Sequence, residues 1–237
     1  MKVEVCHLTK VFGKTRAVDD LSFTLESGEI LGFAGPNGSG KTTTMGIIAT
    51  LDEPTSGDVL VDGRSVLDYP DEARKAIGFM PDFLPGQSDI SAHEYIDFFA
   101  RAHGYTGVER KQRVKAVEDF TNVTPIRGKV LSALSRGMKQ RVSLARAMIH
   151  DPKLLIMDEP ANGLDPRARI EFRTYAKKLA AQGKAILISS HILADLNEIC
   201  TGCLIVEKGR LVKKITGDLR GIDLESVFIE STRGDVQ

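Results

Sequence analysis

The chain has little that would hold it in a membrane or against nucleic acid. No apolar run in its 237 residues approaches the roughly 20 residues that a helix needs to cross a bilayer. Its first ten residues lack the apolar stretch of a signal peptide. Lysine plus arginine equals aspartate plus glutamate at 32 each, so no excess of positive charge favours nucleic acid. We therefore expect a cytoplasmic protein that binds no nucleic acid and does not enter a membrane by itself.

Cysteine is scarce as well. Cys200 and Cys203 form a C-x-x-C pair, and Cys6 stands alone. No second pair and no neighbouring histidines complete a zinc site. We interpret the three as small, reduced apolar residues, with a redox or metal role as the weaker alternative. The absence of a disulfide framework is typical of the cytoplasm.

What the chain does have is an ordinary globular composition with a clear alternation of elements. Hydrophobic residues make up 42% and charged residues 27%, and the length suits one or two domains with a substantial core. Short strand-like segments separated by turns fill the first third, a mostly helical part follows from about 91 to 150, and strands and helices then alternate. These patterns predict the following elements: strands at 3–8, 21–25, 29–35, 58–63, 76–80, 153–158 and 184–190, helices at 93–103, 113–120, 142–149, 169–181 and 192–199, and a hairpin at 203–215.

Buried strands that alternate with helices predict an α/β fold with a mainly parallel sheet covered on both faces. The helical middle is then an insertion in that core. We expect a single domain in which 1–81 and 151–220 form the core, about 82–150 form a helical subdomain, and about 221–237 form a short C-terminal tail.

A glycine-rich loop lies between a predicted strand and a predicted helix. Gly35, Gly40, Lys41 and Thr42 match G-x-x-x-x-G-K-[ST]. In such a loop backbone N–H groups and the helix dipole bind phosphate, the lysine reaches the β- and γ-phosphates, and the threonine hydroxyl holds Mg²⁺. The alternative is a chance glycine-rich turn, which would match in about one chain of this length in a hundred. The predicted nucleotide-binding residues of the loop are Gly35, Pro36, Asn37, Gly38, Ser39, Gly40, Lys41, Thr42 and Thr43.

A second predicted strand ends in two acids. Asp158 closes the apolar run at 153–157, at the sheet edge where α/β proteins bind ligands, and would ligate Mg²⁺. Glu159 would face the γ-phosphate and activate the attacking water as a general base. His191 follows the strand at 184–190 and should reach the same edge, where it could orient water and phosphate. Taken singly, two acids at a strand end are as often merely structural, and a lone histidine there is usually structural or solvated.

With these pieces in order, nearly the whole chain resembles the nucleotide-binding domain of ATP-binding cassette (ABC) transporters. "GPNGSGKTT" is similar to the family's Walker A motif, "LLIMDEP" to Walker B with the catalytic glutamate, "ANGLDP" with Asp165 to the D-loop, "SSH" to the switch histidine and "LSRGM" to the LSGGQ signature. Phe12 falls where the family has an aromatic residue that stacks on adenine; alone it would be an ordinary core or turn residue. The resemblance implies a P-loop NTPase core with an N-terminal antiparallel β subdomain and an inserted helical subdomain.

Two positions depart from the family pattern. The signature is Leu134-Ser135-Arg136-Gly137-Met138, with arginine for the first glycine and methionine for glutamine. Asp82 takes the place of the glutamine of the Q-loop; it could offer an oxygen to Mg²⁺ but donates no hydrogen bond. Gln87 lies too far along the chain to be the substitute.

The resemblance implies a Mg²⁺-dependent ATPase subunit of an export-type transporter. Two such domains pair head to tail as a homodimer or heterodimer, and Ser135, Arg136, Gly137 and Met138 contact ATP held by the other domain. A separate transmembrane permease would hold the chain on the cytoplasmic face of the membrane. Three alternatives stay open: a soluble ABC ATPase, a regulatory subunit with little turnover, and another P-loop class, although the sequence has no N-K-x-D guanine-reading element.

Overall fold

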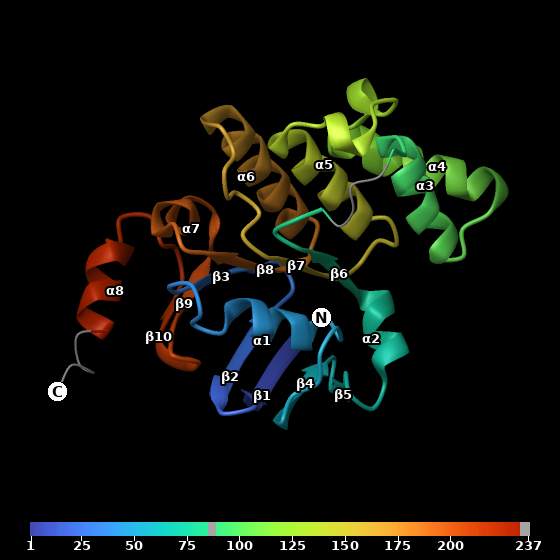
Figure 1. Cartoon of the computed structure of the whole chain (residues 1–237). Coiled ribbons are helices and arrows are strands. Elements are labelled where there is room, and N and C mark those ends of the chain that lie inside the picture. Colours follow the sequence, from blue (N-terminus) through green and yellow to red (C-terminus); the bar gives the residue numbers. More distant parts are fainter. Residues whose placement is uncertain (85–88, 233–237) are drawn as a thin grey trace.

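The structure is a computed structural model that describes residues 1–84 and 89–232. Its centre is a six-stranded sheet, with most helices above it and a smaller antiparallel sheet below it in the view of Figure 1. The strand order in the central sheet is β10-β9-β3-β8-β7-β6. The bounds of these strands are β3 Ile30–Ala34, β6 Ile77–Met80, β7 Leu154–Met157, β8 Ala185–Ser190, β9 Gly202–Glu207 and β10 Arg210–Thr216.

All neighbouring strands of the central sheet are parallel except β10, which runs antiparallel to β9. The carboxyl ends of β3, β7 and β8 therefore meet at one edge of the sheet. The smaller sheet has the order β2-β1-β4-β5 and is antiparallel throughout. Its strands are β1 Lys2–Phe12, β2 Thr15–Glu26, β4 Ser56–Val61 and β5 Arg64–Ser65.

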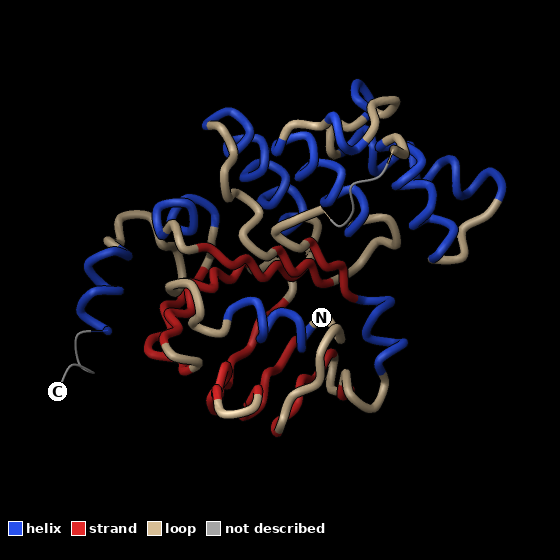
Figure 2. Tube along the Cα trace, in the orientation of Figure 1, coloured by secondary structure: helices blue, strands red, loops and turns tan. Residues whose placement is uncertain are grey.

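Most helices gather on one side of the central sheet, as the blue segments of Figure 2 show; α1 and α2 lie nearer the antiparallel sheet, and α8 lies beside β10. α3, α4 and α5 pack on one another beyond β6 and form the helical part of the chain. The helices are α1 Lys41–Ile48, α2 Pro70–Ala76, α3 Ala92–Ala102, α4 Gly107–Phe120, α5 Arg136–Ala147, α6 Pro166–Ala181, α7 Leu193–Ile199 and α8 Leu224–Thr232, with 3₁₀ turns at Thr124–Ile126 and Leu131–Ala133.

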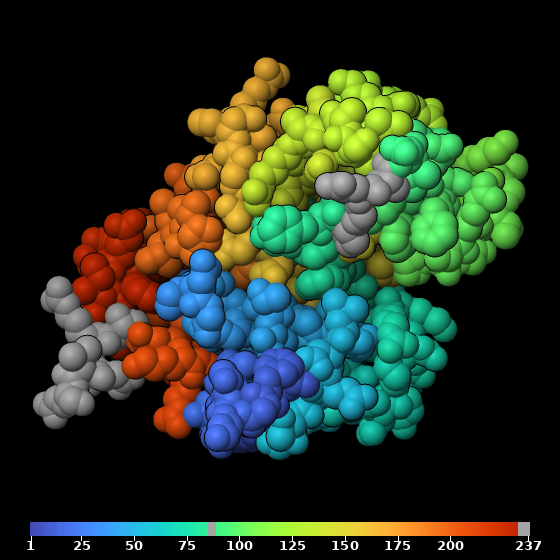
Figure 3. Space-filling view, in the orientation of Figure 1, coloured from blue at the N-terminus to red at the C-terminus, as the bar shows by residue number. Residues whose placement is uncertain are grey.

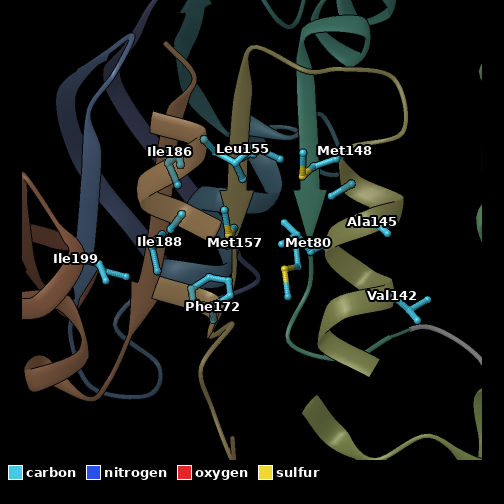
Figure 4. Close-up of a cluster of buried hydrophobic side chains, with 14 of the residues drawn as sticks. Met80, Val142, Ala145, Met148, Leu155, Met157, Phe172, Ile186, Ile188 and Ile199 are labelled. Atoms are coloured by element: carbon cyan, nitrogen blue, oxygen red, sulfur yellow. The ribbon is translucent and has the colours of Figure 1, made fainter. Parts of the chain in front are cut away.

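The central strands are buried on both faces because successive side chains point to opposite sides of a sheet. On β7, Leu155 and Met157 face a core shared with α5, α6 and α7 (Figure 4), while Leu154 and Ile156 face a second core under α1 and the antiparallel sheet. The same alternation runs along β3 and β8. The predicted α/β fold, with its mainly parallel sheet and antiparallel β part, is confirmed.

The two cysteines of the C-x-x-C pair are buried apolar residues, as the sequence predicted. Cys200 and Cys203 are free and buried, and burial raises the pKa of both thiols, that of Cys203 to about 12. Both sulfurs thus stay protonated, as their interpretation as apolar residues requires.

In the described part of the chain, no helix combines the length and the apolar character needed to cross a bilayer. The last five residues of the predicted tail, and Gln87, lie outside the described residues.

Candidate nucleotide site

The glycine-rich loop joins the carboxyl end of β3 to the first turn of α1, so its backbone N–H groups and the helix N-terminus face the same edge of the sheet. Gly40 caps the helix with φ of 99°, in the left-handed region. A Cβ at this position would lie 2.3 Å from the carbonyl oxygen of Ala17. Only glycine fits both the backbone conformation and the close approach of the neighbouring chain.

Lys41 is the first residue of α1, and its side chain folds back over the loop. Its Nζ donates to the carbonyl oxygens of Gly35 at 2.7 Å and Pro36 at 3.0 Å. The side chain is only 6% exposed, and this burial lowers the pKa of Lys41, while the carboxylates of Glu159 and Asp158 act in the opposite direction. The ammonium group is thus held at the loop by backbone acceptors, which a phosphate oxygen could replace.

A chain of hydrogen bonds connects the loop to the ends of β7 and β8. Thr42 Oγ1 donates to Asp158 Oδ2 at 2.8 Å, and Ser189 Oγ donates to Asp158 Oδ1 at 2.5 Å. The Ser189 oxygen in turn accepts the backbone N–H of Glu159 at 2.8 Å. Ser189, at 0% exposure, therefore fixes the Asp158 carboxylate and the Glu159 backbone together. Ser189 belongs to the "SSH" motif, but its hydrogen bonds with Asp158 and with the Glu159 backbone depend on the pairing of β7 with β8.

Glu159 lies beyond the end of β7 with φ of 47°, a conformation that is uncommon for a residue with a side chain. Its Oε2 lies 2.8 Å from Nδ1 of His191. Its Oε1 is buried, has no hydrogen-bond partner among the described residues, and lies 3.9 Å from Lys41 Nζ. One carboxylate oxygen is thus held by the histidine, and the other is directed toward the lysine and has unused hydrogen-bonding capacity.

Lys41, Thr42, Asp158, Glu159 and His191 line one cleft of about 680 Å³. The cleft collects most of the predicted site residues and adds five that were not predicted: Thr15, Arg16, Ala17, Asn162 and Lys208. Of these five only Asn162 lies in a recognised motif, "ANGLDP". The predicted residues that line the cleft are Phe12, Asn37, Gly38, Gly40, Lys41, Thr42, Thr43, Asp82, Asp158, Glu159 and His191.

Phe12 lies at the end of β1, at one end of the cleft, and is 50% exposed. Lys10 Nζ lies 4.8 Å from the centre of its ring, so the lysine covers one face of the ring by a cation–π contact. Lys10 is itself held by Asp52, at 2.7 Å. No motif in the sequence marks Lys10, although it lies two residues before Phe12 on the same strand.

The residues that were expected to act on a second subunit's nucleotide lie outside this cleft. Ser135 caps α5 and accepts the backbone N–H of Met138, whose side chain packs on the core. Asp165 caps α6 and accepts the N–H of Ala168 at 3.0 Å. Five of the predicted site residues are also absent from the cleft lining: Gly35, Pro36, Ser39, Gly137 and Asp165.

Arg136 is also absent from the cleft lining, but its side chain contacts a residue that lines the cleft of its own subunit. Its Nη2 lies 3.1 Å from Oδ1 of Asp82, which follows β6. In Figure 3 the teal segment after β6 lies against the yellow-green start of α5. The two departures from the family pattern are therefore in contact, which their separation of 54 residues gave no means to predict.

The oxygen atoms beside the loop fit a magnesium ion. Thr42 and Asp158 offer a hydroxyl and a carboxylate 2.8 Å apart. Within residues 1–84 and 89–232 no three His, Cys, Asp or Glu side chains gather as a metal site. Mg²⁺ in nucleotide sites needs no such group, since it takes one or two protein oxygens and completes its shell with phosphate oxygens and water.

Comparison with known proteins agrees with this geometry. The family model described as ABC transporter matches residues 18–162. The chain is 37% identical to the uncharacterized ABC transporter ATP-binding protein YhcH of Bacillus subtilis, covering 89% of this chain and 68% of that protein. It is 35% identical to the ABC transporter ATP-binding protein NatA of the same organism, covering 93% and 87%. It is 34% identical to the Nod factor export ATP-binding protein I of Burkholderia lata, covering 89% and 69%.

Two solved structures have the same architecture. One, an ATP-binding subunit of an ABC transporter, superposes with a TM-score of 0.86 at 29% identity and covers 98% of this chain and all of that one. The other, a dimeric post-hydrolysis state of the ATP-binding cassette MJ0796 bound to ADP and Pi, has a TM-score of 0.82 at 25% identity and covers 93% of this chain and all of that one. The chain therefore belongs to the ABC transporter family, as an ATP-binding subunit that hydrolyses ATP.

Proposed function

We propose that this chain powers the export of a substrate through a separate transmembrane permease, to which it binds on the cytoplasmic face of the membrane. The relative named as a Nod factor export protein supports the export direction. In this proposal residues 82–150 act as the helical subdomain that lies against the permease, and the rest of the chain holds the nucleotide. The chemical nature of the exported substrate would be set by the permease.

The observation that carries the proposed ATPase site is the convergence of Lys41, Thr42, Asp158, Glu159 and His191 on one cleft. Lys41 and the loop N–H groups would bind the phosphates, and Phe12 would stack on the adenine. Thr42 and Asp158 would hold Mg²⁺. The ion, when bound, would neutralise charge that develops on the phosphate oxygens.

Glu159 is the proposed general base. Its carboxylate would take a proton from a water molecule whose oxygen attacks the γ-phosphorus, while the bond to the β–γ bridging oxygen breaks and ADP leaves with that electron pair. His191, 2.8 Å from Oε2, would keep the carboxylate in place and contact the γ-phosphate. Positioning a base in this way accounts for about 10²- to 10⁴-fold in rate.

Two copies, or one copy and a related subunit, would pair head to tail around the nucleotides. Ser135, Arg136, Gly137 and Met138 lie outside the cleft of their own chain, at and after the start of α5, and would reach ATP in the other subunit. Asp165 would lie at the same interface. The dimeric state described for MJ0796 supports this arrangement.

Glu159→Gln tests the proposal, because the amide keeps the shape of the side chain but accepts no proton. The variant should bind ATP, turn it over at least about 100-fold more slowly and accumulate as a dimer in ATP, as measured by size-exclusion chromatography with light scattering. Unchanged turnover would show that Glu159 is not the base, and a monomer in saturating ATP would contradict the pairing. Purification from membranes with crosslinking should recover the chain with a transmembrane protein.

A further inference from the structure

Asp82 and Arg136 form one structural unit across two parts of the chain. Asp82 follows β6, and Arg136 is the first residue of α5. Arg136 Nη2 lies 3.1 Å from Asp82 Oδ1, and the two side chains are 41% and 21% exposed. A second contact joins the same segments, since Gln140 Nε2 lies 3.4 Å from the carbonyl oxygen of Asp82. The start of α5 is thereby tied to the segment that leaves β6.

The path of the arginine depends on a glycine in the loop before α6. Gly163 has φ of 65°, and a Cβ there would lie 2.9 Å from both Cδ and Nε of Arg136. The side chain therefore passes close to Gly163 on its way to Asp82. It contacts this glycine as well as Asp82, which reduces the conformational freedom that exposed ion pairs otherwise retain.

Asp82 itself lines the nucleotide cleft beside Asp158 and Glu159. β6 and β7 are neighbours, and the N–H of Asp158 donates to the carbonyl oxygen of Met80 at 2.8 Å. Three carboxylates thus surround a cleft that should accept a polyphosphate. Arg136 reaches the Asp82 carboxylate from outside the cleft and offsets its charge. The guanidinium is therefore paired within its own subunit.

We infer that the Asp82–Arg136 pair is a latch that holds the start of α5 toward its own cleft and must open before Arg136 can contact the nucleotide of a second subunit. This inference rests on the proposed pairing of subunits. In this proposal the phosphate of the second subunit lies beyond the reach of a guanidinium that stays 3.1 Å from Asp82. Asp82 is then a positioning residue, which acts through Arg136 by restraining it.

A double-mutant cycle tests the latch, in the Glu159→Gln background with ATP present. Asp82→Asn keeps the size of the side chain but removes its charge, so Arg136 is released and the dimer dissociation constant should fall about two- to fivefold. Arg136→Ala should weaken the dimer. Asp82→Asn added to Arg136→Ala should change nothing further, because no cation is left to release.

A matched control is the Asp71–Arg74 pair on α2, with a separation of 2.8 Å. Asp71→Asn should leave the dimer dissociation constant unchanged. An equal effect of Asp82→Asn with and without Arg136 would overturn the latch, because Asp82 would then act by itself. The absence of any effect of Asp82→Asn, or a weaker dimer, would overturn it as well.

Hydrogen exchange of the nucleotide-free monomer separates this inference from the proposed pairing. If Glu159→Gln forms no dimer in ATP, the pairing of subunits fails, and exchange still decides whether the restraint exists. Asp82→Asn and Arg136→Ala should each speed exchange of amides at the start of α5 and near Gly163 by about two- to fivefold. Unchanged exchange in both variants would overturn the latch whatever the dimer does.

Discussion

Ser189 donates a 2.5 Å hydrogen bond to Asp158 while it accepts the N–H of Glu159 at 2.8 Å. The two acids follow β7, and the serine lies near the end of the neighbouring strand β8. One buried hydroxyl therefore holds both the proposed magnesium ligand and the backbone of the proposed base. Its oxygen has no contact with solvent. This arrangement makes Ser189 a positioning residue, and its loss should lower both the free energy of unfolding and kcat.

Ser189→Ala leaves a buried carboxylate oxygen of Asp158 and the partly buried N–H of Glu159 without this partner. The free energy of unfolding should fall by about 1–3 kcal/mol, and kcat should fall while the KM for ATP changes little. Thermal denaturation and steady-state hydrolysis measure the two effects. Ser143→Ala is the control, because Ser143 Oγ is buried without a hydrogen-bond partner in the described structure, so its removal should leave both quantities unchanged. Normal kcat in Ser189→Ala would contradict the positioning role.

Lys41→Ala removes the buried cation over the phosphate loop. Charge-assisted hydrogen bonds to phosphate are worth about 1.5–3 kcal/mol, so the dissociation constant of ATP should rise about 10- to 150-fold. Isothermal titration calorimetry measures it. Lys75→Ala, at an exposed position on α2, should bind ATP as the unmodified chain does. An ATP affinity in Lys41→Ala equal to that control would refute the proposed contact.

Phe12→Ala removes the ring on which the adenine would stack. Stacking is worth about 1–2 kcal/mol, so ATP should bind about 5- to 30-fold more weakly. Inorganic triphosphate has no base to stack, and its affinity should stay the same. Phe12→Tyr, which keeps the ring, should restore ATP binding. An equal loss of affinity for ATP and for triphosphate would show that the substitution disturbs the cleft as a whole and does not remove a stacking contact with the adenine.

His150 predicts a loss of stability on acidification. Burial, and secondarily His103, lowers the pKa of His150 to about 4, and the two rings stack with centres 4.1 Å apart. The unfolded chain binds this proton near pH 6.5 and the folded chain only near pH 4, so the stability contribution present above pH 6.5 is lost as the pH falls between these values. The cost is at most about 3 kcal/mol, less what partial exposure to solvent screens.

The variant His150→Gln isolates this contribution. Its amide N–H can still donate to the carbonyl oxygen of Ile77, which lies 3.0 Å from His150 Nε2, but it does not titrate in this range. Its melting temperature should fall less than that of the unmodified chain between pH 6.5 and pH 4. Parallel curves for His150→Gln and the unmodified chain would rule out the effect.

The strands of the core were predictable because each is a short apolar run with turn residues at its ends. The helix α2 was not predicted. It has only seven residues, Ala73 is its one buried residue, and its other positions are charged or at its ends, so no apolar periodicity marks it. Its proline at the first turn and the acids after it are helix start signals, but such signals predict a helix only where an apolar periodicity follows them.

The phosphate loop was the most predictable part of the site, because its residues are contiguous and act through backbone conformation. Gly40 and Lys41 are adjacent in the chain and remain so in the structure. Lys10 beneath Phe12 and Ser189 beneath Asp158 were missed for the opposite reason. Each acts through a contact whose partner is chosen by strand pairing or by the direction of a side chain; no motif marks Lys10, and the "SSH" motif pointed to His191 and not to Ser189.

By itself the sequence determined the layered α/β fold, the phosphate loop and the acids at the end of a buried strand, because periodicity and short motifs are local. Only the tertiary structure decided which distant charges meet. Asp82 and Arg136, taken singly, were an oxygen donor in place of the Q-loop glutamine and an arginine in place of a signature glycine. They are a pair because β6 ends beside the first turn of α5, and an ion pair depends on distance in space, which 54 residues of intervening chain do not reveal.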